Sequence, residues 1–186
     1  MSEAGIQVGV ARTRAGVVAG TPRRAIDADA VRALLTEVPD PELPMLSVVD
    51  LGIVHRIDVG SGDRPIRIEI LPTFVGCPAL ELIKTSIAGT VGTLGRPVEV
   101  VATFAVPWTS DRISPAGREA LAAAGIAPPG RVAAPTPVLI ALEERVPCPY
   151  CGSRDTVLDN AFGPTQCRTI RFCRGCRQPF EAIKPV

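Results

Sequence analysis

The chain has little of several residue types on which catalysis and nucleic-acid binding depend. Among its 186 residues there is one histidine, His55, and aromatic residues make up only 4%. Lysine occurs only at positions 84 and 184, so nearly all basic residues are arginine. The formal net charge of +1 gives no overall field that would attract nucleic acid or an anionic membrane. Binding to nucleic acid or to a membrane is therefore not expected.

The scarcity of histidine also excludes particular sites. An iron site made of two histidines and one carboxylate cannot form within one chain, and a cysteine–histidine nucleophilic pair would have to use His55. His55 falls in the middle of an expected strand, which favours a structural or solvent-facing role. No phosphate-binding loop or dinucleotide fingerprint is present. Independent enzymatic activity is therefore the least favoured function.

Long apolar runs and a secretion signal are missing as well. No stretch approaches the roughly 18 apolar residues that a membrane span needs, and arginines interrupt the region where a signal peptide would have its apolar segment. Residues 1–25 show no clear period and are expected to be a disordered extension. We expect a cytoplasmic protein. Six cysteines in such a reducing compartment indicate metal binding rather than disulfides.

The hydrophobic pattern predicts a compact α/β domain of two layers, an α+β arrangement with the order helix, hairpin, helix, strand. The expected elements are a helix over 28–38 capped by Asp27, strands over 53–59 and 66–70, a helix from Pro78 to about 89–95, and a strand over 98–106. The last two strands should be parallel, joined by a right-handed crossover. Ser114 and Pro115 then begin an appended helix that ends at Gly125, so the domain covers 26–126.

Two segments complete the chain. Residues 127–146 are rich in proline and alanine and are interpreted as a linker, with a short strand over 138–142. Residues 147–186 contain two C-x-x-C pairs about twenty residues apart. This spacing indicates a small β zinc ribbon with Cys148, Cys151, Cys173 and Cys176 as ligands of a closed, structural Zn²⁺ site. A single iron or an iron–sulfur cluster is the alternative occupant, and four unliganded thiols are the least favoured.

Cys77 lies between a strand and a helix. Gly76 can adopt a turn conformation closed to other residues, and Pro78 suits the first helical position. This placement predicts Cys77 at the helix N-terminus, where backbone N–H groups and the helix dipole would lower the pKa of the thiol. The alternative is that Cys77 is a small buried residue that fills a tight corner.

The remaining cysteine, Cys167, should not share the ribbon metal. An extended strand over 165–172 would place it about 20 Å from Cys173. It is either a packed strand residue, or it faces Cys77 across the domain boundary and forms a labile metal or cluster site with it. The nearby arginines at 168, 171, 174 and 177 are interpreted as a solvated face or a protein-docking patch rather than a nucleic-acid surface.

Two sets of motifs carry a family resemblance. The segments DPELPMLSVVDLGIV and TFVGCP, within residues 26–107, resemble the MIP18 (DUF59) family of iron–sulfur assembly factors. The segments PWTSDRISPAGREALAAAGIAPPG, CPYCGS, FGPTQC and RFCRGCRQPFEAIK look like the PaaD (also called PaaJ) family of accessory subunits of phenylacetyl-CoA 1,2-epoxidase, the oxygenase of aerobic phenylacetate catabolism. His55 and residues 1–25 depart from this pattern.

The resemblance implies an accessory subunit that helps to mature iron–sulfur or di-iron centres, with the oxygenase subunits and the iron–sulfur reductase as partners. It makes Cys77 the functional cysteine, holding iron or a cluster transiently, and Cys167 an extra thiol. It places Thr73, Gly76, Asp40, Glu42 and Asp50 around Cys77. From the residues alone, turn formation and helix capping are the default roles of these three carboxylates.

Two other functions stay open from the sequence. The chain could be a non-catalytic structural subunit of the oxygenase complex with an inert Cys77, or a zinc-ribbon module that binds nucleic acid. Homodimerisation is also open.

Overall fold

The structure, a computed structural model, describes residues 26–62, 64–74, 76–130 and 146–186. The expected extension over 1–25 and the expected strand over 138–142 lie outside the described residues. Within the described part of the chain, no helix is long and apolar enough to cross a membrane.

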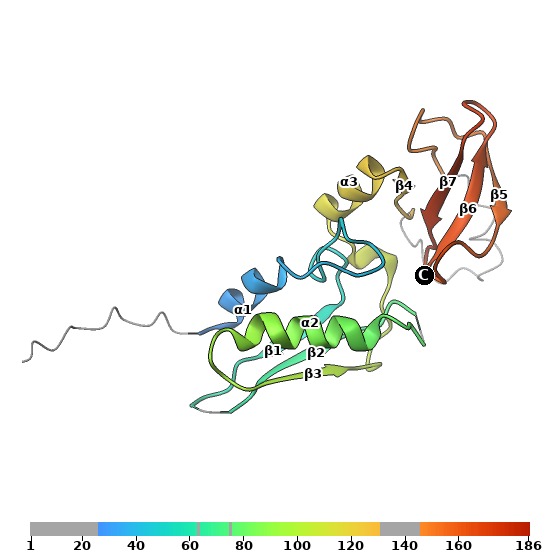
Figure 1. Cartoon of the computed structure of the whole chain (residues 1–186). Coiled ribbons are helices and arrows are strands. Elements are labelled where there is room, and N and C mark those ends of the chain that lie inside the picture. The colour runs from blue at the N-terminus through green and yellow to red at the C-terminus, as the bar shows by residue number, and fades with distance from the viewer. Residues whose placement is uncertain (1–25, 63, 75, 131–145) are drawn as a thin grey trace, which may run out of the picture.

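The first domain has the predicted order of elements. It contains α1 (Ala28–Leu35), β1 (Val54–Asp58), β2 (Ile66–Ile70), α2 (Leu80–Gly92) and β3 (Val98–Ala102). The sheet order is β1-β2-β3, with β1 antiparallel and β3 parallel to β2. Figure 1 shows α2 lying along one face of this sheet with α1 beside it. The predicted two-layer α/β class is therefore confirmed.

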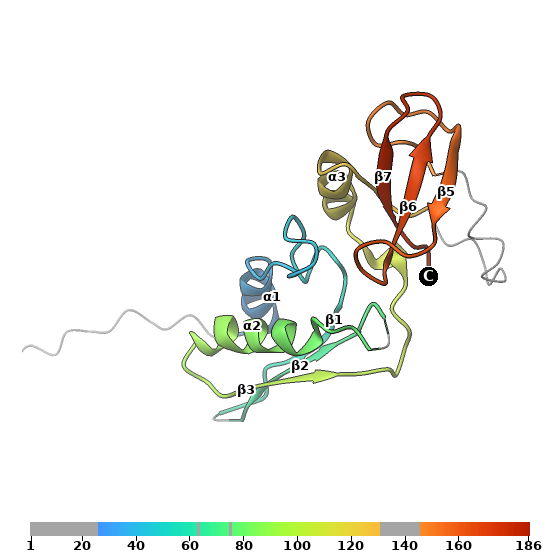
Figure 2. The same ribbon diagram turned by 45° about the vertical axis from the view of Figure 1, so that its right-hand side comes forward.

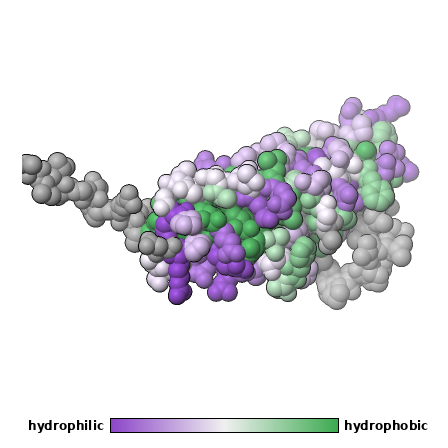
Figure 3. Space-filling model, turned by 60° about the horizontal axis from the view of Figure 1, so that its bottom comes forward, coloured by the Kyte–Doolittle hydropathy of each residue, from purple (hydrophilic) through white to green (hydrophobic). Residues whose placement is uncertain are grey.

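Alternation along β2 explains the two layers. Ile66, Ile68 and Ile70 are fully buried, and they share one core with Ile83 and Ile87 of α2. Burying each such side chain contributes about 1.5–3 kcal/mol. The intervening residues of β2 face the other side of the sheet, where Arg67 forms ion pairs with Glu69 and Glu99. In Figure 3, which brings the lower side of the molecule forward, hydrophilic side chains break up the apolar area.

Two elements are shorter than predicted. The strand expected over 98–106 ends at Ala102, because its partner β2 ends at Ile70, and the last bond runs from Thr103 N to Ile70 O. Phe104 and Val106 are consequently 65% and 39% exposed. The helix expected over 28–38 ends at Leu35 and continues as turns before Pro39, since a residue that precedes proline disfavours helix.

The predicted capping roles of Asp27 and Ser114 are confirmed. Asp27 Oδ1 accepts a hydrogen bond from Ala30 N at 2.8 Å. Ser114 Oγ accepts one from Gly117 N at 2.9 Å at the start of α3 (Pro115–Ala123), which follows the 3₁₀ turn η1 (Ser110–Arg112). Gly125 ends this helix region with a φ of +78°.

The second sheet belongs to the ribbon. Its order is β4-β7-β6-β5, built from β4 (Ile126–Ala127), β5 (Thr156–Asn160), β6 (Arg168–Cys173) and β7 (Pro179–Ile183). β4 follows α3 directly and pairs in parallel with β7. Both views of the ribbon diagram show α3 and β4 between the two sheets (Figures 1 and 2). Ile126 and Ile183 are buried in the core of the first domain, so the ribbon is docked against it.

Candidate metal centre and interdomain thiol pocket

The four cysteines of the C-x-x-C pairs converge on one point. Their sulfurs all lie within 4.8 Å of one another, with 3.7 Å between Cys148 and Cys176 and 3.6 Å between Cys151 and Cys173. A tetrahedral ion with Zn–S bonds of about 2.3 Å requires sulfur–sulfur edges of about 3.8 Å. The donor set and its spacing therefore fit a tetrahedral metal ion. The four thiolates would complete its coordination and leave no position for a substrate.

Matching backbone turns present these thiols. The residue after each pair has a positive φ, +73° at Gly152 and +62° at Arg177. Gly152 N donates to Cys148 O, and Arg177 N donates to Cys173 O, at 2.8 Å each. Cys176 N also donates to Cys173 Sγ at 3.5 Å, and this bond is the main cause that lowers the pKa of Cys173 to about 7. Burial raises the pKa of Cys176 in the same cluster to about 12, so only a bound metal ion would deprotonate the whole set.

Cys77 occupies the loop between β2 and α2, but not the helix cap. The N-cap of α2 is Ala79, so Pro78 does not take the predicted first helical position. The backbone N–H of Ala79 lowers the pKa of the Cys77 thiol. Burial, together with the nearby Glu42 and Asp40 carboxylates, outweighs this influence, so the pKa of Cys77 is raised. The prediction of a lowered pKa is therefore wrong, because desolvation exceeds the effect of the helix terminus.

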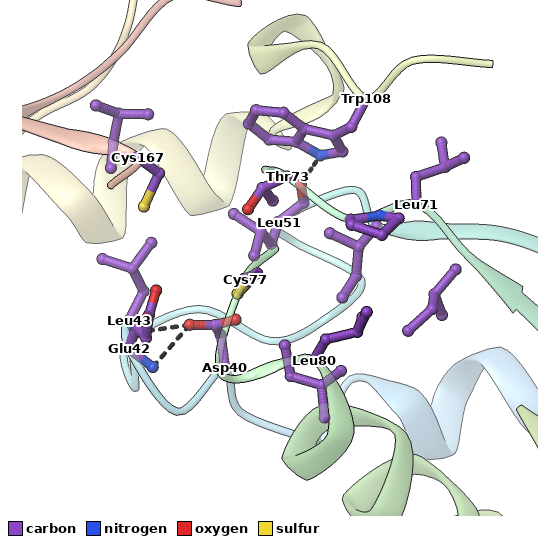
Figure 4. A pocket seen from close by; sticks show the side chains of 15 residues that line it. Asp40, Glu42, Leu43, Leu51, Leu71, Thr73, Cys77, Leu80, Trp108 and Cys167 are labelled. Carbon is purple, nitrogen blue, oxygen red and sulfur yellow. Dashed lines mark hydrogen bonds between the residues drawn. The ribbon is translucent and has the colours of Figure 1, made fainter. Parts of the chain in front are cut away.

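The half-buried Cys77 thiol lines a pocket between the two domains (Figure 4). Cys167 enters the same pocket from the ribbon, and Trp108 closes one side, where its Nε1 donates to Leu51 O at 3.0 Å. The other lining residues come from the α1–β1 segment, β2, its following loop, α2 and β7: Asp40, Glu42, Leu43, Leu51, Ile53, Ile70, Leu71, Pro72, Thr73, Leu80, Ile83 and Ile183. Four of the predicted residues thus join Cys77 here: Asp40, Glu42, Thr73 and Cys167.

The pocket is narrow inside and wider outside. Its inner part offers about 30 Å³ to the centres of water-sized solutes, room for about two water molecules at roughly 10–15 Å³ each. The adjoining outer part offers about 240 Å³ and is lined by Phe74, Pro78 and residues 162–166. Glu42, Thr73, Cys77 and Cys167 line both parts. The inner space is large enough for an ion.

Asp40 has the turn-forming role that its residue type suggests. It is only 5% exposed, and its Oδ1 accepts hydrogen bonds from Glu42 N at 2.9 Å and Leu43 N at 2.8 Å. Burial is the main effect and raises the pKa of this carboxyl despite the two bonds. Asp40 therefore shapes the turn that presents Glu42 to the pocket, and it also lines the pocket itself.

Asp50 and Gly76 lie outside the pocket lining, although the resemblance groups them with Cys77. Asp50 accepts hydrogen bonds from the hydroxyls of Ser47 and Ser114, at 2.7 Å each, and these bonds lower its pKa. It therefore connects the α1–β1 segment to the start of α3. Gly76 has a φ of +84° and supplies the predicted turn beside Cys77.

The arginine run is not a uniform solvated face. Arg168 forms a 2.6 Å ion pair with Glu181, and Arg171 is only 4% exposed, whereas Arg174 and Arg177 are exposed. The solvated-face interpretation is wrong for these two, because Arg171 lies on the buried face of β6 and Arg168 is held by its ion pair with Glu181. His55 is half-buried at an irregularity of the β1–β2 register and does not line the thiol pocket.

Sequence reasoning missed Thr165, which lies two residues before Cys167. Its Oγ1 is 3.2 Å from the Cys167 sulfur and accepts a 2.8 Å bond from Arg168 Nε. The adjacency of Thr165 and Arg168 to Cys167 was the only signal in the chain, but the periodicity of the arginines obscured it.

Comparison with known proteins agrees with both halves of the chain. Residues 28–102 match the family model of an iron-sulfur cluster assembly protein, and residues 133–184 match the PaaD zinc beta ribbon domain. An Escherichia coli (strain K12) protein, named as the D component of 1,2-phenylacetyl-CoA epoxidase, is 38% identical over 156 residues, which are 83% of this chain and 90% of the relative. The chain belongs to this PaaD family. The resemblance found in the sequence is thereby confirmed.

Solved structures similar to this chain include two that align with half of it. The DUF59 domain of Bacillus anthracis is 27% identical with a TM-score of 0.46, and the alignment covers 50% of this chain and 89% of that one. A conserved hypothetical protein of Thermotoga maritima is 31% identical with a TM-score of 0.44, and the alignment covers 50% and 92%.

Proposed function

We propose that this chain is an accessory subunit of a multicomponent phenylacetyl-CoA epoxidase that assists maturation of an iron–sulfur or di-iron centre. Cys77 holds the iron or cluster transiently before the client takes it. The oxygenase and iron–sulfur reductase subunits are the clients. The chain itself performs no independent catalysis in this proposal.

One observation carries the proposal: the Cys77 thiol lines an ion-sized space that opens outward, on a domain matched by an iron-sulfur cluster assembly family. Thiolates are the usual ligands of iron–sulfur clusters. The thiols and carboxylates in the lining favour handling of a metal over chemistry on phenylacetyl-CoA. The name of the Escherichia coli relative supports the epoxidase as the context.

The ribbon has a structural role in this proposal, with Zn²⁺ as its metal. Four thiolates in tetrahedral spacing, with no open position, are typical of structural zinc. Bound zinc would hold the two cysteine turns together. The ribbon would thereby keep β6 and β7 in place against the first domain.

The test is co-expression of the oxygenase and reductase subunits with the wild-type chain or with Cys77→Ser. The iron and sulfide contents of the purified clients are then measured. We expect under-metallated clients with Cys77→Ser, although the variant folds and retains its ribbon metal. Thr85→Ala, on the exposed side of α2, is the matched control and should give fully loaded clients.

Fully loaded, active clients made with Cys77→Ser would refute the proposal. Stable co-purification of that variant with the clients at fixed stoichiometry, together with normal activity, would instead identify a structural subunit.

A further inference from the structure

We propose that Cys77 and Cys167 bind the iron cargo together, as a two-thiolate site that exists only while the ribbon is docked on the first domain. This inference rests on the proposed function and adds a second ligand to it. Its starting point is that the two thiols come from different domains but line the same pocket, in both its inner and its outer part.

The Cys167 thiol is held in place by a chain of hydrogen bonds. Arg168 Nε donates to Thr165 Oγ1 at 2.8 Å, and this hydroxyl lies 3.2 Å from the Cys167 sulfur, to which it can donate its own proton. The backbone of Cys167 is fixed as well, because Lys184 N donates to Cys167 O at 2.9 Å. A donated hydrogen bond favours the thiolate. Thr165 therefore both orients the sulfur and supports its deprotonated form.

Arg168 also connects the two halves of the pocket. The same guanidinium forms the 2.6 Å ion pair with Glu181 of β7, and its Nη2 donates to Glu42 O at 3.4 Å. Glu42 belongs to the first domain and lines both parts of the pocket. Arg168 is thus a positioning residue, because its one side chain contacts Thr165 beside Cys167, Glu181 of the ribbon sheet and Glu42 of the first domain.

The charges around the thiols favour a cation. Glu42 faces both sulfurs and Asp40 faces Cys77. Burial and these carboxylates raise the pKa of both thiols, while Arg168 and Thr165 oppose the increase at Cys167. A bound Fe²⁺ would reverse this effect, since a metal ion deprotonates the thiols that coordinate it. Binding then releases one proton per thiol and requires no electron transfer.

The proposed site differs from the ribbon metal site in how many ligands the chain supplies. Among the described residues, the only group of three or more potential ligands within reach of one ion is the four-cysteine set. Asp40, Glu42, Cys77 and Cys167 share a pocket without converging as tightly. A site with two thiolates leaves coordination positions for ligands of a client, as a transfer site requires. The four-thiolate site has none.

The ribbon metal also affects the proposed two-thiolate site. β6 has the metal ligand Cys173 at its end, and Cys167 immediately precedes its start. About 20 Å separates the two ends of such a strand, so Cys167 does not join the metal set. The metal instead fixes β6, and β6 positions Cys167 opposite Cys77. Loss of the ribbon metal would therefore also remove the second thiolate from the pocket.

The test is an anaerobic titration of the full chain, with its ribbon metal in place, with Co²⁺ as a coloured substitute for Fe²⁺. We expect a thiolate-to-cobalt absorption band that saturates at one further metal per chain. Cys167→Ser should weaken this binding by about 100-fold or more, since even the loss of an outer-shell partner costs about 10–100-fold. Arg168→Lys, which keeps the charge but not the fork of donors, should weaken it by about 10-fold.

Asp159→Asn is the matched control, because it alters an exposed ribbon residue outside both parts of the pocket and retains both thiols. It should bind Co²⁺ as the wild type does. Zinc content and circular dichroism show whether each variant keeps its ribbon. If Cys77→Ser abolishes the band while a folded Cys167→Ser retains wild-type affinity, the two-thiolate site is wrong and the proposed function stands. Normal client metallation with both variants would overturn the function as well.

Discussion

Asp50 provides a test of the site, because the family resemblance places this residue around Cys77 and the structure does not. The structure assigns Asp50 to a connection between Ser47 and Ser114, outside the thiol pocket. Replacement by asparagine keeps the shape of the side chain but removes its charge. It leaves one acceptor oxygen for two hydroxyl donors. We therefore expect a loss of stability without a loss of metal binding in the pocket.

The magnitude follows from the two 2.7 Å hydroxyl–carboxylate bonds. A hydrogen bond to a charged group contributes about 1.5–3 kcal/mol, and partial access of water to this carboxylate favours the lower end. Asp50→Asn loses one bond of this kind and weakens the other, so the free energy of unfolding should fall by about 1–2 kcal/mol. For a chain of this size, the corresponding decrease in Tm is about 3–6 °C.

The effect should depend on pH in a defined direction. The serine hydroxyls lower the pKa of Asp50 in the folded state below the unfolded value of about 3.9. The stabilisation is therefore fully present above about pH 4 and is lost as the pH falls through the folded pKa. Asparagine does not titrate, so the stability difference between wild type and variant should narrow below about pH 4.

Urea unfolding followed by circular dichroism, from pH 7 down to pH 3, measures this difference. Asp159→Asn is the matched control, because it removes one exposed carboxylate from β5, far from Ser47 and Ser114 along the chain. If Asp50→Asn unfolds like this control and instead weakens Co²⁺ binding in the thiol pocket, the structural role is refuted. Asp50 would then belong with Cys77, as the family resemblance implies.

Two further predictions concern the ribbon metal and one glycine. Removing the ribbon metal with a strong chelator under reducing conditions should abolish hydrogen-exchange protection in β5–β7 but not in β1–β3. The reason is that the separate ribbon core contains few large apolar side chains besides Phe180. Unchanged protection in β5–β7 would show that the ribbon folds without its metal. Gly52→Ala should lower the free energy of unfolding by about 2–3 kcal/mol or more, because Gly52 has a φ of +72° and a Cβ there would lie 2.3 Å from Arg112 O. Gly89→Ala, on α2 with open space around its Cβ, is the control and should stabilise the chain by about 0.5–1 kcal/mol in the same denaturation assay; equal effects of the two substitutions would contradict the packing around Gly52.

The sequence predicted the elements whose causes are local. The alternation of Ile66, Ile68 and Ile70 identified a strand with one buried face. Asp27 and Ser114 identified helix starts because their capping bonds span only three residues. The spacing of the four ribbon cysteines identified the metal ligands for the same reason, since a single turn presents each pair.

Lengths and electrostatics depended on contacts that are distant in sequence. The end of β3 is set by the end of its partner β2, so the continuing alternation through Phe104 and Val106 was misleading. The pKa of Cys77 followed burial and the carboxylates of another segment rather than the nearby helix. Arg171 became buried because it lies on the covered face of β6, in line with Thr169 and Cys173.

The sequence by itself therefore determined the fold class, the metal ligands of the ribbon and the membership of the PaaD family, because these depend on short-range spacing and on matched segments. Only the tertiary structure decided which residues share the pocket. It brought Cys167 into the same cavity as Cys77 from about ninety positions away, and it placed Asp50 elsewhere. The physical reason is that the docking of the two domains, through the β4–β7 pairing and the Arg168–Glu42 contact, leaves no periodic pattern in the chain.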